Sequence, residues 1–278
     1  MLLKRIELIV LGILIIGIIG YAGTGIVYAG VMVANADRTL NTVVSHQNDF
    51  SKSFNEITTE HKALSGSNFN PKDEVALADK SVMSSQLAAQ TINQDDAALG
   101  SVERSLEGSR WLTAISRSSL DRESTRIRHL QNSLAAGRTI AAAGVVDGHF
   151  WHSVYSALAD LDLINTQAGS GDFTSARTTL TTMKADVDHA VQQPASPSLP
   201  ADLRQLVIEL QTLVADYSKQ LDAQIAGDDP TVAAQQAVLD ADRTKLASYD
   251  MDKVGTEIDG FYKPLIDRFN SEVAAATA

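Results

Sequence analysis

The chain has 278 residues, of which 44% are hydrophobic, so its apolar side chains suffice for the core of one large domain or of two small ones. Its formal net charge of -11 repels phosphate backbones and anionic headgroups, which argues against nucleic acid as a partner. There are no cysteines, which excludes disulfides, thiolate metal sites, iron-sulfur clusters and a cysteine nucleophile.

An uncharged, mostly apolar run from Leu8 to Ala36 predicts a transmembrane helix over residues 6–36. A helix crosses the hydrocarbon core of a bilayer in about 20 residues, so this run can span it even with some tilt. The residues assigned to the anchor, in contact with the lipid bilayer, are Leu8, Ile16, Ile19 and Val33. The chain is therefore expected to be a single-pass protein of the cell membrane.

The orientation of the anchor follows from Lys4 and Arg5, which directly precede the apolar run. By the positive-inside tendency, they place residues 1–5 in the cytoplasm and residues 37–278 outside the membrane. The alternative is a signal peptide cleaved after Ala36, but signal-peptide apolar cores are only about 7 to 15 residues long. Both interpretations export the domain. The lack of cysteine and the high alanine and aspartate content favour a prokaryotic source.

Residues 37–278 are expected to form an all-α domain, an extended antiparallel bundle with coiled-coil hairpins. Mostly apolar residues, with Gln47 and His61 among them, recur at alternating spacings of three and four from Leu40 to Leu64, which predicts that the membrane helix continues outward. Asn70 and Pro71 supply an N-cap and a first-turn proline for a second helix. Its heptad stripe is expected at Val75, Ala78, Val82, Ser85, Ala89, Ile92, Leu99 and Leu106, with Asp96 and Glu103 as charged exceptions.

Further helices are expected over residues 111–134, 145–167, 172–193, 203–225 and 230–278. The glycines of residues 137–144 are expected to end the first of these helices. Asp172 and Asp228 suit N-caps, and a kink is expected at Pro264. The prolines of residues 194–200 form the clearest loop, which either divides two subdomains or lies within one bundle.

His149 and His152 lie three residues apart and would share a helix face, which is the geometry that two imidazoles need to hold one metal ion. Asp147 is the nearby carboxylate that would join them. The competing interpretation is a polar edge at the start of an aromatic-rich helix. Trp111, Phe150, Trp151 and Tyr155 would line a ligand pocket between helices, or else fill the core.

Catalytic signatures do not stand out in the sequence, which contains no nucleophile elbow, metalloprotease helix, Walker loop or dinucleotide fingerprint. No catalytic residue, enzyme activity or cofactor is therefore expected. The anchor and the heptad seams predict a membrane-anchored extracytoplasmic module that binds or scaffolds a protein or cell-envelope partner, or associates with itself. An exported bundle that binds a small ligand or a metal ion is the alternative, and a cell-envelope hydrolase is a third interpretation.

Overall fold

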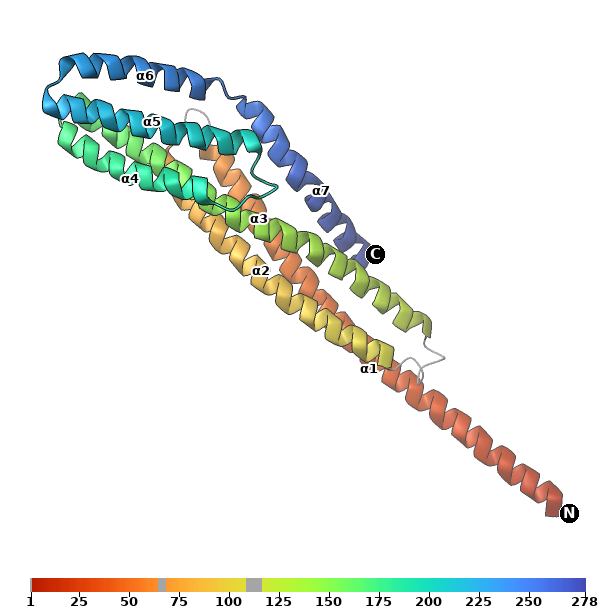
Figure 1. The fold of residues 1–278 in the computed structure, drawn as a ribbon. Coiled ribbons are helices and arrows are strands. Elements are labelled where there is room, and N and C mark those ends of the chain that lie inside the picture. The colour runs from red at the N-terminus through yellow and green to blue at the C-terminus, as the bar shows by residue number, and fades with distance from the viewer. Residues whose placement is uncertain (1, 65–68, 109–116) are drawn as a thin grey trace. The chain divides into compact units, whose positions relative to one another are not determined.

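A computed structural model describes the backbone of residues 2–64, 69–108 and 117–278 (Figure 1). Within these ranges, side chains are described from residue 28 onward, except at residues 29, 61, 62 and 64. The described residues form seven α-helices and no strand, which confirms the all-α fold class that the sequence predicts.

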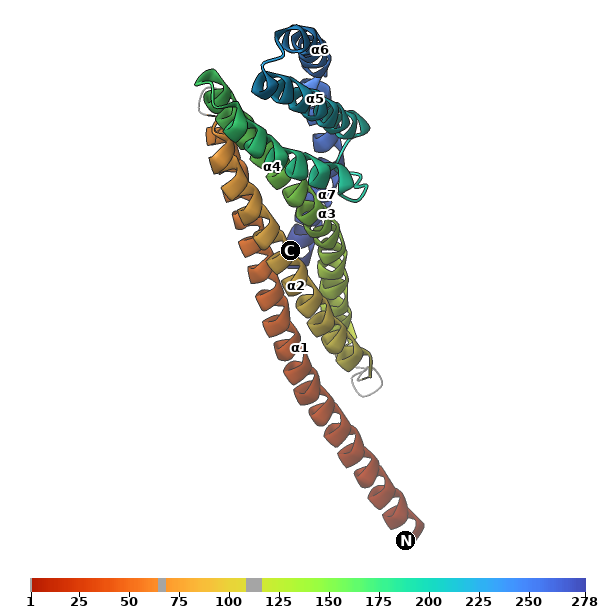
Figure 2. The ribbon, with the colours of Figure 1, turned by 60° about the vertical axis from the view of Figure 1, so that its left-hand side comes forward.

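The helices are α1 (Leu2–Leu64), α2 (Pro71–Gly108), α3 (Arg117–Gly169), α4 (Phe173–Gln192), α5 (Ala201–Ala226), α6 (Asp229–Ala247) and α7 (Met251–Thr277) (Figures 1 and 2). Several of their ends follow the capping rules that the sequence displays. Asp172 accepts a hydrogen bond from the Ser175 backbone N–H at 3.0 Å and caps α4. Asp228 caps α6 in the same way, and Gly227 ends α5 in the left-handed conformation with φ 68°.

The break predicted at residues 137–144 is wrong, because α3 runs through it without interruption. The glycines here are contact points with neighbouring helices. A side chain at Gly144 would collide with Ser85 of α2, and one at Gly137 would lie 3.2 Å from Ile92 of α2. These glycines therefore permit close helix packing, and the packing compensates their low helix propensity.

The last predicted helix is also wrong, because it is two helices, α6 and α7. The break falls at Ser248, which ends α6, and at Asp250, whose carboxylate accepts a hydrogen bond from the Lys253 backbone N–H at 2.9 Å. Asp250 is thus positioned as a helix cap. Pro264 lies inside α7, which continues past it.

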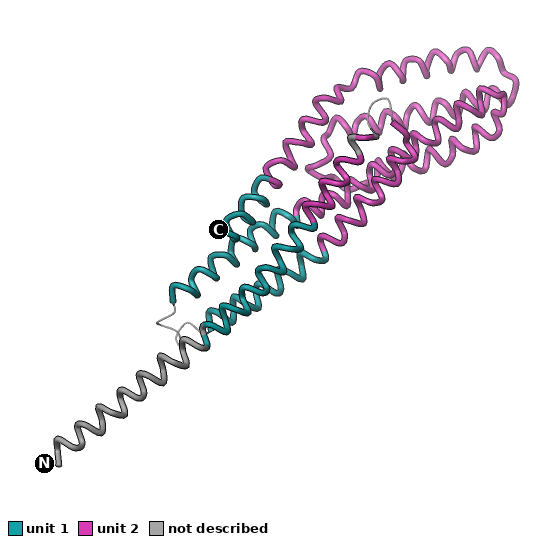
Figure 3. The backbone as a smooth tube through the Cα atoms, turned by 180° about the vertical axis from the view of Figure 1, so that it is seen from behind, with its two compact units in different colours: residues 1–49, 90–138, 267–278 teal, residues 50–89, 139–266 magenta. Residues whose placement is uncertain are grey.

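The chain divides into two compact units, which Figure 3 draws in different colours. Unit 1 consists of residues 1–49, 90–138 and 267–278, and unit 2 consists of residues 50–89 and 139–266. The proline loop over residues 194–200, where the sequence allows a subdivision, lies within unit 2.

Unit 1 combines parts of α1, α2, α3 and α7 around an aliphatic core. Its largest fully buried side chains are Leu40, Leu99, Leu120, Ile127, Leu130 and Leu134. The charged exceptions in the predicted α2 seam find polar partners on α3: Arg138 donates to Asp96 at 3.0 Å, and Gln131 donates to Glu103 at 3.1 Å. Of the predicted α2 stripe, Ile92, Leu99 and Leu106 are buried in this unit.

Unit 2 has its hydrophobic core between α3, α4 and α5. Its fully buried side chains include Phe150, Ile164, Leu180, Met183, Leu203 and Leu221. Helix α5 packs against α4 on one side and against α6 on the other (Figures 1 and 2). Helix α6 buries only Leu239, so most of its surface is not part of the core.

The predicted anchor falls largely outside the described side chains, which start at Tyr28. The anchor and orientation residues in that segment are Lys4, Arg5, Leu8, Ile16 and Ile19, whereas Val33 is described and is half-buried. Among the residues whose side chains are described, no helix has an apolar stretch long enough to cross a membrane. The transmembrane helix remains a prediction from the sequence.

Candidate functional site

Unit 2 contains a cleft of about 470 Å³ between α3, α5 and α6. Helix α3 lines it between residues 151 and 165, α5 between residues 203 and 217, and α6 between residues 239 and 246. Phe69, just before α2, and Met251, the first residue of α7, complete the lining. The cleft is therefore built from helices that are far apart in the sequence.

The helices line the cleft because each has one apolar stripe. The stripe of α5 consists of Leu203, Leu206, Leu210, Leu213 and Tyr217, and the stripe of α3 includes Trp151, Tyr155 and Leu158. Spacings of three and four residues place side chains on a single face of a helix. One face of α5 thus supplies both core residues and the wall of the cleft.

The cleft is elongated along the helix axes. Its lining residues extend from residue 151 to 165 in α3 and from 203 to 217 in α5, a distance of 14 residues in each helix. Because a helix rises about 1.5 Å per residue, each wall is about 21 Å long. Helices α3 and α5 run in the same direction, because the C-terminal ends of both lie near the start of α4. Thr179 of α4 donates to Gln167 of α3 at 3.0 Å, and Arg177 of α4 donates to Asp222 of α5 at 2.8 Å.

Aromatic rings form part of the wall. Trp151 and Tyr155 stack with ring centroids 5.4 Å apart and an interplanar angle of 23°. Phe69 lies 6.2 Å from Tyr155, and Phe150, on the core side, contacts Trp151 edge to face at 5.3 Å. Such contacts fix the rings in place, so they present a flat, rigid apolar surface to the cleft.

The lining also contains four polar side chains: Tyr155, Asn165, Tyr217 and Arg243. Burial raises the pKa of Tyr155, and the nearby Glu74 carboxylate raises it further. Burial also raises the pKa of Tyr217, although the positive charge of Arg243 acts in the opposite direction. Both phenols are therefore neutral near pH 7, and each hydroxyl can donate or accept a hydrogen bond.

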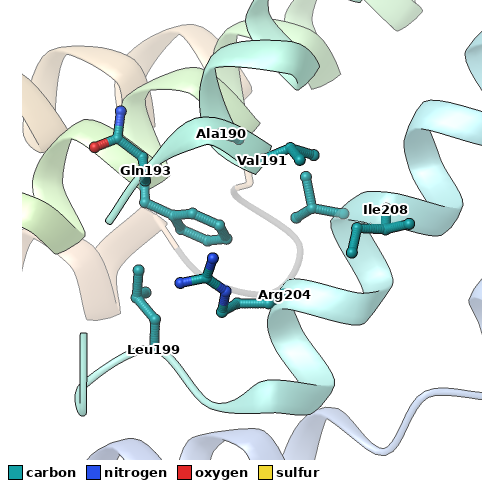
Figure 4. Close-up of a pocket in the computed structure, with 8 residues that line it drawn as sticks. Ala190, Val191, Gln193, Leu199, Arg204 and Ile208 are labelled. Atoms are coloured by element: carbon teal, nitrogen blue, oxygen red, sulfur yellow. The ribbon is translucent and has the colours of Figure 1, made fainter. Parts of the chain in front are cut away.

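A second, much smaller cavity of about 20 Å³ lies between α4, α5 and the proline loop (Figure 4). Arg204 extends into it beside Leu199, and its buried Nη1 atom has no hydrogen-bond partner among the described residues. A cavity of this size has room for one water molecule and none for an organic ligand. The larger cleft is therefore the better candidate for a binding site.

Asp147 lies in a buried polar cluster of unit 2. Its carboxylate accepts hydrogen bonds from the hydroxyls of Ser198 and Tyr262, each at 2.6 Å, and these join α3 to the proline loop and to α7. Burial raises the pKa of Asp147 despite both hydrogen bonds. Burial and the Asp147 charge together raise the pKa of Tyr262. The cluster is a structural tie rather than an open site, because Asp147 is only 9% exposed.

Replacing Asp147 by asparagine should weaken the dependence of stability on pH. A raised pKa means that the folded chain binds the proton more tightly than the unfolded chain, so stability falls as pH rises from the ordinary value of 3.8 through the folded value. Asparagine has no such titration. The urea midpoint of the full chain between about pH 4 and pH 8 tests this expectation.

Other carboxyls whose pKa is raised, such as those of the half-buried Asp160 and Asp186, change stability in the same direction, so the readout is the difference between the variant and the wild type. Asp147→Ala is the companion variant. It leaves the Ser198 and Tyr262 hydroxyls without their acceptor and should cost about 2 kcal/mol near pH 7. If the asparagine variant had the same dependence of stability on pH as the wild type, titration of Asp147 would not be the cause of that dependence.

The residues predicted to hold a metal ion face different surroundings. Asp147 is engaged with two hydroxyls, and His149 is exposed. His152 Nδ1 lies 2.8 Å from Asp79 Oδ1, as in an ion pair, but not in a hydrogen-bonding direction. Within the part of the chain whose side chains are described, no group of three or more His, Asp or Glu residues is arranged to hold a metal ion. The metal site remains a prediction from the sequence.

The sequence indicates some of the cleft residues and misses others. Trp151 and Tyr155, predicted as pocket candidates, line the cleft, whereas Phe150 fills the core and Trp111 lies outside the described residues. Arg243 carries no such signal in the sequence, because its place in the cleft depends on how α6 pairs with α5. The leucine stripe of α5 was the available signal, although a core helix has the same pattern.

Comparisons of the chain with protein-family models, with curated proteins and with solved structures found no match. The geometry of the chain is therefore the basis for assigning a function.

Proposed function

We propose that the chain is a membrane-anchored, extracytoplasmic binding module whose unit 2 takes an elongated apolar small molecule in the cleft between α3, α5 and α6. The anchor and the exported location rest on the sequence. The ligand rests on one observation, the cleft of about 470 Å³.

The size and lining of this cleft support a ligand site. Pockets that bind small molecules measure about 300–1,000 Å³ and are mostly apolar, with a few polar groups that orient the ligand. The cleft falls within this range, and its lining combines many apolar and aromatic side chains with Tyr155, Asn165, Tyr217 and Arg243. We therefore favour a small ligand over the protein or cell-envelope partner that the sequence predicts.

Quenching of Trp151 fluorescence tests the proposal directly. The chain has two tryptophans, so Trp111→Phe leaves Trp151, in the wall of the cleft, as the only one. The probe is 11-bromoundecanol, a neutral alkyl chain whose bromine quenches a tryptophan in contact with it. With the full chain in lipid nanodiscs, we expect saturable quenching of Trp151.

Two variants separate binding in the cleft from adsorption elsewhere. Leu206→Phe with Leu246→Phe fills the cleft and should weaken probe binding by fivefold or more, about 1 kcal/mol. Met83→Ser with Leu87→Ser removes exposed apolar side chains outside the cleft, 68% and 64% exposed, and should change nothing. Quenching that is absent, that does not saturate, or that follows the second variant instead of the first would overturn the proposal.

A further inference from the structure

Three of the four polar side chains of the cleft, Asn165, Tyr217 and Arg243, lie toward one end. Asn165 and Tyr217 are the last lining residues of α3 and α5, the two walls that run in the same direction. Helix α6 is antiparallel to α5, because Gln220 bonds Gln236 at 2.8 Å while Glu209, earlier in α5, pairs with Lys245 at 2.6 Å. Along the axis of α5, Arg243 therefore lies between the positions of Glu209 and Gln220, on the side of Tyr217.

The opposite end is mostly apolar, although Tyr155 lies one helical turn from it. Trp151 and Leu203, the first lining residues of α3 and α5, lie there, and Leu246 is the lining residue of α6 that extends furthest in the same direction. The cleft is thus amphipathic along its length. An elongated ligand would place its apolar end against Trp151 and its polar end near Arg243.

Arg243 is the only charged side chain among the described residues that line the cleft. Its Nη1 atom donates to Asp240 on the same helix at 3.1 Å, and both side chains are more than half exposed, at 52% and 61%. Such a surface pair is weak, and a guanidinium group has five N–H donors, so Arg243 retains donors for a second anion. Its charge also reaches into the cleft, because it acts on the pKa of the buried Tyr217 hydroxyl.

The shape of the cleft suits one extended alkyl chain. Its volume of about 470 Å³ lies in the lower half of the range of small-molecule pockets, about 300–1,000 Å³. A wall of about 21 Å also suits a single extended chain.

We infer that the ligand is a single-chain amphiphile with an anionic headgroup, whose alkyl chain fills the cleft and whose carboxylate or phosphate binds Arg243. This inference rests on the proposed function and specifies its ligand. The acidic groups Asp240, Asp242, Asp216 and Glu209 lie around Arg243 and repel an anion. Lys245 pairs with Glu209 and Lys219 pairs with Asp216, each at 2.6 Å. Asp240 lies 3.1 Å from Arg243, too close for salt to screen, so an anion competes with it for the guanidinium group. A headgroup bound directly to Arg243 would also be within this short range, so salt would weaken that contact only slightly.

The test compares headgroups on the same alkyl chain in the Trp111→Phe background. The probes are 11-bromoundecanoate, 11-bromoundecyl phosphate and neutral 11-bromoundecanol, near pH 8 in nanodiscs. We expect at least one anionic probe to bind about fivefold more tightly than the alcohol, the upper end of what one partly exposed charge-assisted contact contributes. The more strongly favoured headgroup indicates whether the natural ligand is a fatty acid or a phosphate ester.

Arg243→Gln should remove this preference and leave binding of the alcohol unchanged. Arg177→Gln is the matched control, because Arg177 forms a similar surface ion pair, with Asp222 at 2.8 Å, outside the cleft. Equal binding of all three probes, or a preference that survives Arg243→Gln, would overturn the headgroup inference while the cleft remains a ligand site. If no probe binds, the proposed function fails with it.

Discussion

Replacing Gly148 by leucine should lower the free energy of unfolding of unit 2 by about 2 kcal/mol, since overpacking costs about 3 kcal/mol and higher helix propensity returns about 1. A Cβ atom at Gly148 would lie 2.5 Å from Val82 Cγ2 and 3.3 Å from the Ala78 carbonyl oxygen of α2. Valine has little rotational freedom, and the carbonyl oxygen belongs to the backbone of a helix, so the neighbours cannot simply move aside. The remaining atoms of leucine would have to separate α2 from α3.

Urea unfolding of the full chain, followed by Trp151 fluorescence in the Trp111→Phe background, measures this loss within unit 2. Gly260→Leu is the matched control in the same unit, because a Cβ at Gly260 of α7 meets nothing within 4 Å. That variant should be more stable than the wild type by about 0.8 kcal/mol, from helix propensity alone. Replacement of glycine by leucine is therefore expected to lower the free energy of unfolding at Gly148 and to raise it at Gly260. A gain in stability at Gly148 would mean that α2 and α3 do not pack closely there.

Glycine also explains why the helix boundaries could be predicted only in part. In the sequence, Gly137 and Gly144 look like helix breakers, because glycine has a low helix propensity. Their role depends on Ile92 and Ser85, which lie far earlier in the chain and which no local pattern connects to them. Asp172 and Asp228 could be predicted as caps, since a cap bonds the backbone within its own first turn.

The cleft shows the same limit on a larger scale. Heptad spacing in α5 identifies a face that will be buried, but it does not reveal whether a helix or a ligand will cover that face. Phe150 and Trp151 are neighbours in the sequence, yet one fills the core and the other lines the cleft. Arg243 reaches the cleft only through the antiparallel pairing of α5 and α6, which the sequence does not encode locally.

Truncating Phe150 to alanine should lower the free energy of unfolding by about 4 kcal/mol, the largest single effect that we expect in this chain. The ring is 1% exposed and belongs to the core cluster of unit 2. It also borders the small cavity beside Arg204, so the space left by the ring would merge with an existing void. Rigid helices on several sides limit how far the surroundings can collapse, and the uncollapsed volume sets the cost.

Helical circular dichroism during urea unfolding is the appropriate measurement, because Phe150 contacts Trp151 and its removal alters the tryptophan signal. Leu163→Ala on the same helix is the control: its side chain is 47% exposed, and the change should stay within about 0.5 kcal/mol. The Phe150 variant should also bind the neutral alkyl probe less tightly, since Trp151 loses the edge contact that holds it in the wall of the cleft. A variant as stable as the wild type would show that the core between α3, α4 and α5 can close over the missing ring.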